Sequence, residues 1–273
     1  AGDCSFIGSG DRNWNGGFSS AIVAGCCSFV DYDYSFIGGG ICNFIGTFLS
    51  PSIPKSSSIV GGSFNTISGS SSGFSVIAGG CRNTVSGKYS TISGGYCNNV
   101  NECRSIISGG YCNTVCCNSV DSFIGSGFCN IINGQTSVIV GGSWNCNCGN
   151  WSAIVGGSGH LINGSSSAFI GGGYGNIITN SALYGNIVGG SYNSVSGQYS
   201  NIIGGSYNSV SGYYGSIVGG RKNKVTGRCG TVSGGYCNIA SGENSFVANG
   251  NCNTASGQYS IVAGEKNIVG GCY

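Results

Sequence analysis

The amino-acid sequence predicts an all-β protein, a single-chain parallel β-solenoid of about 17 coils. Three observations predict this fold. A Gly-Gly-x-x-Asn motif or a close variant returns about every 15 residues, two columns of Ile and Val recur with it, and the chain has 55 Gly but only 2 Pro. A period of this length is typical of stacked supersecondary units. We therefore predict one β-solenoid domain over residues 1–273, with no capping helix and a loop insertion at about 47–57.

Each repeat contains two short segments in which side chains alternate between apolar and polar, which predicts two strands with one buried face each. In the first segment, the inner residue stands three positions before the second Gly and is always Ile or Val, from Ile7 to Ile261. In the second segment, the inner residue stands two positions after the Asn and is mostly Val or Ile. The exceptions are Asn15, Asn147, Ala240 and Ala255.

The Gly and Asn residues predict the turns. A coil of this length must reverse direction twice, and positive φ angles cost least for Gly. We expect Asn to occupy the left-handed region at a turn, with its amide bonded to the same Asn of the next coil. His160 stands in the Asn column, so we interpret it as a ladder variant rather than a catalyst. The ladder is most regular at Asn193, Asn208, Asn223, Asn238 and Asn253.

The outward positions of the first strand are unusually apolar, and a long exposed apolar stripe usually marks an interface. We therefore predict lateral association of copies of the chain. The alternative is that these are the scattered apolar residues found on most protein surfaces. The predicted interface comprises Phe6, Phe36, Val60, Phe123, Val138, Val140, Val155, Phe169, Val188, Ile203 and Val218. The second strand carries more Ser and Thr at its outward positions.

Seventeen cysteines in a chain with 7% charged residues favour an oxidising, extracellular setting, with buried inert thiols as the alternative. One cysteine column precedes the Asn, and neighbours in it are candidates for disulfides between coils: Cys27, Cys42, Cys97, Cys112, Cys237 and Cys252. Cys4 and Cys272 hold nearly equivalent positions at opposite ends of the sequence, which makes them candidates for an intersubunit disulfide. The spacing of the cysteines does not match a zinc site, so no metal is expected.

Several function classes have no support in the sequence. No catalytic constellation is visible, so we expect neither an enzyme nor a cofactor. The net charge of +2 predicts no binding to nucleic acid, and no apolar run approaches the roughly 18 residues of a membrane span. The chain begins with Ala1 and contains no Met, which suggests a processed mature product. Asn150 and Asn163 lie in Asn-x-Ser sequons and are possible glycosylation sites.

The segment Ser-Gly-Gln-Tyr-Ser-Asn-Ile-Ile-Gly-Gly-Ser-Tyr-Asn-Ser-Val-Ser-Gly at 196–212 resembles the head repeats of YadA-type trimeric autotransporter adhesins. That resemblance implies a left-handed parallel β-roll that trimerises on a bacterial surface. The Asn-x-Val-x-Gly units are also similar to those of the ryegrass ice-binding β-roll. The chain departs from the adhesins in its many cysteines.

Our main functional hypothesis is a structural protein, the subunit of an extracellular or virion-surface fibre. It would assemble by head-to-tail stacking, because an uncovered solenoid end presents unpaired backbone groups to another chain. One alternative is an adhesin head that binds a host or matrix surface as a trimer. A second alternative is an ice-binding protein, which requires a flat, regular Thr/Ser face. The sequence offers such regularity only in parts of the second strand.

Overall fold

The computed structural model describes residues 2–47, 55–69 and 72–271. Within these residues the chain contains β-strands and no helix, and each coil of about 15 residues contributes two strands. The 34 strands therefore form about 17 coils of a parallel β-solenoid, which confirms the predicted fold class. Contacts between Cα atoms divide the chain into two compact units, unit 1 (Ala1–Thr136) and unit 2 (Ser137–Tyr273), and each is described by itself. The expectation of a single domain stays a prediction.

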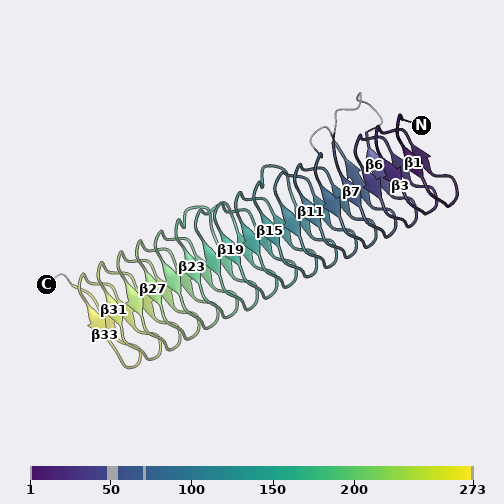
Figure 1. The fold of residues 1–273 in the computed structure, drawn as a ribbon. Coiled ribbons are helices and arrows are strands. Elements are labelled where there is room, and N and C mark those ends of the chain that lie inside the picture. Colours follow the sequence, from purple (N-terminus) through teal and green to yellow (C-terminus); the bar gives the residue numbers. More distant parts are fainter. Residues whose placement is uncertain (1, 48–54, 70–71, 272–273) are drawn as a thin grey trace. The chain divides into compact units, whose positions relative to one another are not determined.

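Unit 1 contains strands β1 to β16 (Figure 1). The odd-numbered strands are β1 (Phe6–Ile7), β3 (Ala21–Ile22), β5 (Phe36–Ile37), β7 (Ser58–Ile59), β9 (Val76–Ile77), β11 (Thr91–Ile92), β13 (Ile106–Ile107) and β15 (Phe123–Ile124). The even-numbered strands are β2 (Trp14–Asn15), β4 (Phe29–Val30), β6 (Phe44–Gly46), β8 (Thr66–Ser68), β10 (Thr84–Val85), β12 (Asn99–Val100), β14 (Thr114–Val115) and β16 (Ile131–Ile132).

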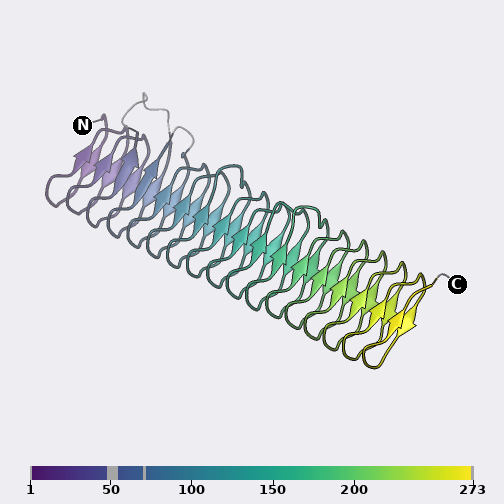
Figure 2. The same ribbon diagram turned by 180° about the vertical axis from the view of Figure 1, so that it is seen from behind.

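Unit 2 contains strands β17 to β34, and Figure 2 shows the coils from behind. Its odd-numbered strands are β17 (Val138–Ile139), β19 (Ala153–Ile154), β21 (Phe169–Ile170), β23 (Asn186–Ile187), β25 (Asn201–Ile202), β27 (Ser216–Ile217), β29 (Thr231–Val232), β31 (Phe246–Val247) and β33 (Ile261–Val262). Its even-numbered strands are β18 (Cys146–Asn147), β20 (Leu161–Ile162), β22 (Ile177–Ile178), β24 (Ser194–Val195), β26 (Ser209–Val210), β28 (Lys224–Val225), β30 (Ile239–Ala240), β32 (Thr254–Ala255) and β34 (Ile268–Val269).

In both units the strands pair in parallel and in register with the equivalent strands of neighbouring coils. Asn201 pairs with Ser216 on the odd strands, and Ser209 pairs with Lys224 on the even strands. The backbone N–H of Ile203 donates to the carbonyl of Ile217 at 3.0 Å, and equivalent bonds recur along the coils. Because the register does not slip, equivalent side chains form straight ranks across each sheet.

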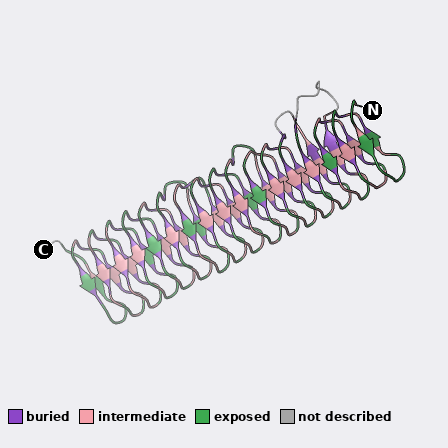
Figure 3. Cartoon of the chain, in the orientation of Figure 1, coloured by how far each residue is buried: buried purple, intermediate pink, exposed green. Residues whose placement is uncertain are grey.

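The core consists of the two predicted inner columns, which are buried in every coil except at the outermost ones (Figure 3). One predicted inner residue is wrong. Ile261 is 70% exposed, whereas Val262 is 5% exposed and pairs with Val247. The turn after β33 is one residue shorter than in the other coils, so counting back from Gly264 reached the wrong side chain.

The Asn ladder is present, but its hydrogen bonds differ from those expected. The Asn208 amide donates to the carbonyls of Gly204 and Gly220 at 3.1 and 3.0 Å, and its Oδ1 accepts the backbone N–H of Asn223 at 2.9 Å. Bonds between two side-chain amides also occur, for example from Asn253 to Asn238 at 3.2 Å. The ladder therefore connects side chains to backbone and satisfies polar groups at the buried turn.

The left-handed residue of this turn is the one before the Asn, not the Asn itself. Tyr207, Lys222 and Cys237 have φ angles of 56°, 58° and 59°. A non-Gly residue in this region costs about 1–2 kcal/mol, and the hydrogen bond from the Tyr207 N–H to the carbonyl of Ser191, 2.9 Å long, offsets part of that cost. The expectation that Asn occupies the left-handed region is thus wrong.

The loop insertion predicted at 47–57 falls mainly on residues 48–54, which lie outside the described residues. The coils that flank it remain paired, since Phe36 pairs with Ser58 and Phe44 pairs with Thr66. The insertion therefore leaves the strand register of unit 1 unchanged.

Candidate functional site: an uncharged sheet face

We define the odd-strand face as the outward side chains of the odd-numbered strands, namely the first residue of each strand and the residue that follows the strand. The even-strand face is defined in the same way. In unit 2 the odd-strand face comprises Val138, Val140, Ala153, Val155, Phe169, Gly171, Asn186, Val188, Asn201, Ile203, Ser216, Val218, Thr231, Ser233, Phe246, Ala248, Ile261 and Ala263. It contains no Asp, Glu, Lys or Arg.

The odd-strand face of unit 2 is regular at its centre. Asn186, Asn201, Ser216 and Thr231 form a polar rank of paired residues. The parallel rank beside it contains Val188, Ile203 and Val218, which are 49%, 52% and 46% exposed. All three side chains are β-branched and therefore have few rotamers. A polar rank therefore runs beside a rigid apolar rank.

Two phenylalanines on the odd-strand faces, Phe169 and Phe36, lie beside a glycine of the same strand segment. A Cβ atom placed on Gly171 would lie 3.3 Å from Cε1 of Phe169, so the ring lies across the glycine position. Phe36 and Gly38 show the same 3.3 Å distance in unit 1. The glycine leaves room for the ring to lie across the strand rather than project from it.

The spacing between coils can be measured from the aromatic residues at the adjoining turn. The rings of Tyr184, Tyr199 and Tyr214 stack with centroids 5.0 Å apart at each step. This agrees with the ~4.7–4.9 Å distance between neighbouring strands, and outward residues along a strand repeat at about 6.6 Å. The face is thus a two-dimensional grid of side chains.

The even-strand face of unit 2 differs because it carries a charge. Lys224 is exposed at the first position of β28, between Ser209 and Ile239. The residue that follows each even-numbered strand carries a hydroxyl group in six consecutive coils: Thr179, Ser196, Ser211, Thr226, Ser241 and Ser256. The Ser256 hydroxyl donates to the carbonyl of Val269 at 3.3 Å, and the Ser196 hydroxyl makes a similar bond of 3.4 Å to Val210.

The predicted lateral-interface residues all lie on the odd-strand face of their unit. Phe123 and Val138 are half-buried and the others are exposed. The structure confirms their outward position but does not test association between chains. The absence of charge on this face was not predicted, although a count of charged residues at the outward positions reveals it.

The predicted inter-coil cysteine pairs lie at the same turn of adjacent coils, with positive φ angles. The thiols of Cys97 and Cys112 are neighbours, and burial together with the Cys97 thiol raises the pKa of the Cys112 thiol. Burial likewise raises the pKa of Cys252 beside Cys237. Cys27 and Cys42 are also neighbours. All six thiols are unbonded, so the disulfides stay a prediction. Cys4 is exposed, and its predicted partner Cys272 lies outside the described residues.

His160 is buried in the Asn column as predicted. Its Nδ1 accepts the backbone N–H of Asn176 at 3.1 Å, while its Nε2 makes no hydrogen bond of standard geometry, although the Gly173 backbone lies near enough to affect the imidazole. Burial lowers the pKa of the imidazole. Among the glycosylation candidates, Asn163 is exposed on the even-strand face and Asn150 is half-buried at the turn after β18.

In the described part of the chain, no cluster of three or more His, Cys, Asp or Glu side chains could hold a metal ion. The same residues include no helix with the length and apolar character needed to cross a membrane.

Residues 184–273 match the family model of the grass antifreeze beta roll. The match begins at Tyr184 and covers the polar and apolar ranks at the centre of the odd-strand face of unit 2. The comparison with curated proteins gave no match. The matched segment is therefore similar to an antifreeze β-roll.

This match corrects two earlier hypotheses. The resemblance to YadA-type adhesin heads is not supported, whereas the resemblance to the ryegrass ice-binding β-roll is. The main functional hypothesis, a fibre subunit that stacks head to tail, is wrong for the same reason, and a role in adhesion gains no support. Adhesin heads and ice-binding β-rolls have repeats of similar length and pattern, so the short motif could not distinguish the two classes. The match agrees with the predictions of a non-enzymatic protein and of an extracellular location.

Proposed function

We propose that the protein binds ice through the odd-strand face of unit 2. One observation carries this proposal: the segment similar to an antifreeze β-roll presents a sheet face that is uncharged at every outward position. We expect the protein to act outside the cell, where it would meet growing ice crystals.

The absence of charge matters because ice adsorption replaces mobile hydration water with ordered water. A charged side chain keeps its own hydration shell, and removing that shell costs several kcal/mol. Apolar side chains such as Val188, Ile203 and Val218 carry no such cost. The neighbouring Asn201, Ser216 and Thr231 can exchange hydrogen bonds with water molecules held over the apolar rank.

Rigidity supports the same function. The outward side chains start from backbone that is paired on both sides within unit 2, as for Asn201 between Asn186 and Ser216. The β-branched side chains lose little rotamer freedom on binding. A preorganised grid can therefore match a crystal surface without a large entropic cost.

The even-strand face is a second candidate because of its unbroken hydroxyl rank from Thr179 to Ser256. Two features disfavour it. Lys224 places an exposed charge on this face, and a glycan on Asn163 would cover part of it.

Paired lysine substitutions distinguish the two faces. Ile203→Lys places a charge at the centre of the odd-strand face, and Ser211→Lys places the same charge on the even-strand face of the next strand. We expect Ile203→Lys to lower thermal hysteresis and ice recrystallisation inhibition strongly, and Ser211→Lys to leave both near the wild-type level. Circular dichroism would confirm that both variants fold.

Two results would contradict this proposal. A wild-type protein that shows neither thermal hysteresis nor incorporation into growing ice would overturn the proposed function. Loss of activity in Ser211→Lys alone would assign ice binding to the even-strand face.

A further inference from the structure

We propose that unit 1 carries a second ice-binding surface, on the odd-strand face of β7, β9, β11 and β13. This inference rests on the proposed function and extends it to a part of the chain outside the segment that matches the antifreeze family, which begins at residue 184. The surface comprises Ser58, Val60, Val76, Ala78, Thr91, Ser93, Ile106 and Ser108.

Like the face in unit 2, this surface stands on paired parallel strands and carries no charge, but each of its two ranks mixes hydroxyl and apolar residues. Ser58 pairs with Val76, Val76 with Thr91, and Thr91 with Ile106. The rank that follows the strands, from Val60 to Ser108, is exposed in all four coils. No charged side chain occupies any of the eight outward positions. The inner residues directly beneath are fully buried, so the grid stands on a packed core.

A serine ladder fixes the backbone at the start of these strands. The Ser90 hydroxyl donates to the carbonyl of Glu102 at 2.8 Å and accepts the backbone N–H of Ser105 at 3.2 Å. The Ser105 hydroxyl continues the ladder to the carbonyl of Ser119 at 3.1 Å. The residues that precede Thr91 and Ile106 are therefore held by bonds between coils, and the ranks remain aligned.

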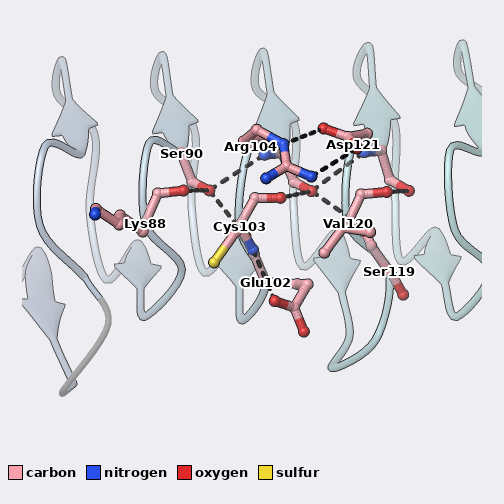
Figure 4. Close-up of polar contacts among 10 residues, drawn as sticks. Lys88, Ser90, Glu102, Cys103, Arg104, Ser119, Val120 and Asp121 are labelled. Atoms are coloured by element: carbon pink, nitrogen blue, oxygen red, sulfur yellow. Dashed lines mark hydrogen bonds and ion pairs between the residues drawn. The ribbon is translucent and has the colours of Figure 1, made fainter.

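Four charged residues near this surface, Lys88, Glu102, Arg104 and Asp121, lie at the turn that precedes these strands and have protein partners (Figure 4). Arg104 donates to both carboxylate oxygens of Asp121, at 2.6 and 2.9 Å, and these bonds lower the pKa of Asp121. Glu102 accepts the backbone N–H groups of Cys103 and Asn118 at 3.0 and 2.8 Å. Lys88 lies over the rings of Phe74 and Tyr89. These contacts hold the charges at the edge of the sheet rather than on the face.

The mixture of side chains favours ice over a second protein chain. Four of the eight residues carry a hydroxyl group and four are apolar. The two kinds alternate along the first rank, Ser58, Val76, Thr91 and Ile106, whereas the second rank changes from Val60 and Ala78 to Ser93 and Ser108. The buried core of a protein interface is usually enriched in aromatic residues and depleted in Ser. Small hydroxyl and methyl groups in straight ranks are better suited to ordered water.

Thr91 and Thr84 provide a matched test in the full chain. Thr91 lies on the odd-strand face and Thr84 on the even-strand face of the preceding coil, so Thr91→Lys and Thr84→Lys make the same chemical change on opposite faces. We expect Thr91→Lys to reduce thermal hysteresis, because the loss of one of two linked binding surfaces removes their combined avidity. Thr84→Lys should leave it unchanged.

A double variant separates this inference from the proposed function. If both units bind ice, Ile203→Lys retains measurable incorporation into growing ice, and Ile203→Lys with Thr91→Lys loses it. If Ile203→Lys alone abolishes incorporation and Thr91→Lys has no effect, unit 2 binds ice by itself and the second surface is refuted. An equal loss in Thr84→Lys would also refute it. Sedimentation analysis adds a further criterion, since a change from dimer to monomer in Thr91→Lys without a change in hysteresis would identify the surface as a protein interface.

Discussion

Replacing Asn208 by Ala removes one step of the Asn ladder in unit 2. The variant loses two donated hydrogen bonds, to Gly204 and Gly220, and leaves the buried backbone N–H of Asn223 without its acceptor. Each lost hydrogen bond costs about 1 kcal/mol net, and an unsatisfied buried N–H costs about 1–3 kcal/mol. The Gly220 carbonyl keeps a second donor, the N–H of Ser206 at 2.9 Å, which limits its share of the loss. The expected destabilisation is therefore about 3–5 kcal/mol.

Denaturant unfolding followed by far-UV circular dichroism measures this loss, and hydrogen exchange localises it to the amide of Asn223. Asn201→Ala is the matched control, because Asn201 lies on the preceding strand, β25, and is exposed on the odd-strand face. A surface substitution of this kind changes stability by about 0.5 kcal/mol or less. If Asn208→Ala is no more destabilised than Asn201→Ala, the ladder does not stabilise the coils.

Three further predictions concern stability. Burial lowers the pKa of His160 in the folded state, so the unfolded chain binds the proton more readily. We therefore expect the free energy of unfolding to be highest above pH ~6.5 and to fall as the pH drops below that value. His160→Asn should remove that dependence and raise stability by about 1 kcal/mol, since an amide replaces an Nε2 that makes no hydrogen bond of standard geometry; unchanged acid sensitivity would contradict this. If Cys97 and Cys112 form a disulfide in oxidising medium, peptide mass spectrometry should detect the crosslink, and reduction should cost about 3 kcal/mol; two free thiols after oxidation would exclude it. Ile217→Ala should cost about 2–5 kcal/mol in denaturant unfolding because Ile217 is fully buried, and a cost below 1 kcal/mol would indicate that the core collapses around the cavity.

The sequence was sufficient to predict the coil, its inner columns and the placement of the Asn ladder. These features follow from the alternation of side chains and the repeat length, which can be recognised in the sequence without knowing the conformation of the turns. The prediction failed at Ile261, where one residue is missing from a turn. The serines that recur two positions before the inner residue of the odd-numbered strands would have avoided the error, because Ser260 precedes Val262 as Ser245 precedes Val247.

The function of the apolar face could not be derived from its residues alone. Val188, Ile203 and Val218 were correctly predicted to face outward, but exposed apolar side chains serve protein partners and ordered water alike. The left-handed turn residues were also beyond prediction. Tyr207 and Cys237 are not residue types that favour positive φ angles, and their conformation is set by hydrogen bonds between coils.

The Asn ladder has an evolutionary consequence. The backbone N–H of Asn208 donates to Asn193 of the preceding coil, and the Asn208 side chain makes two bonds to the next coil, to Gly220 and Asn223. Both sides of a coil are therefore interchangeable with those of its neighbours. A duplication or deletion of one 15-residue repeat would leave every remaining coil with an equivalent neighbour. The area of an ordered surface could then change in single-coil steps through recombination between repeats, without any new packing solution.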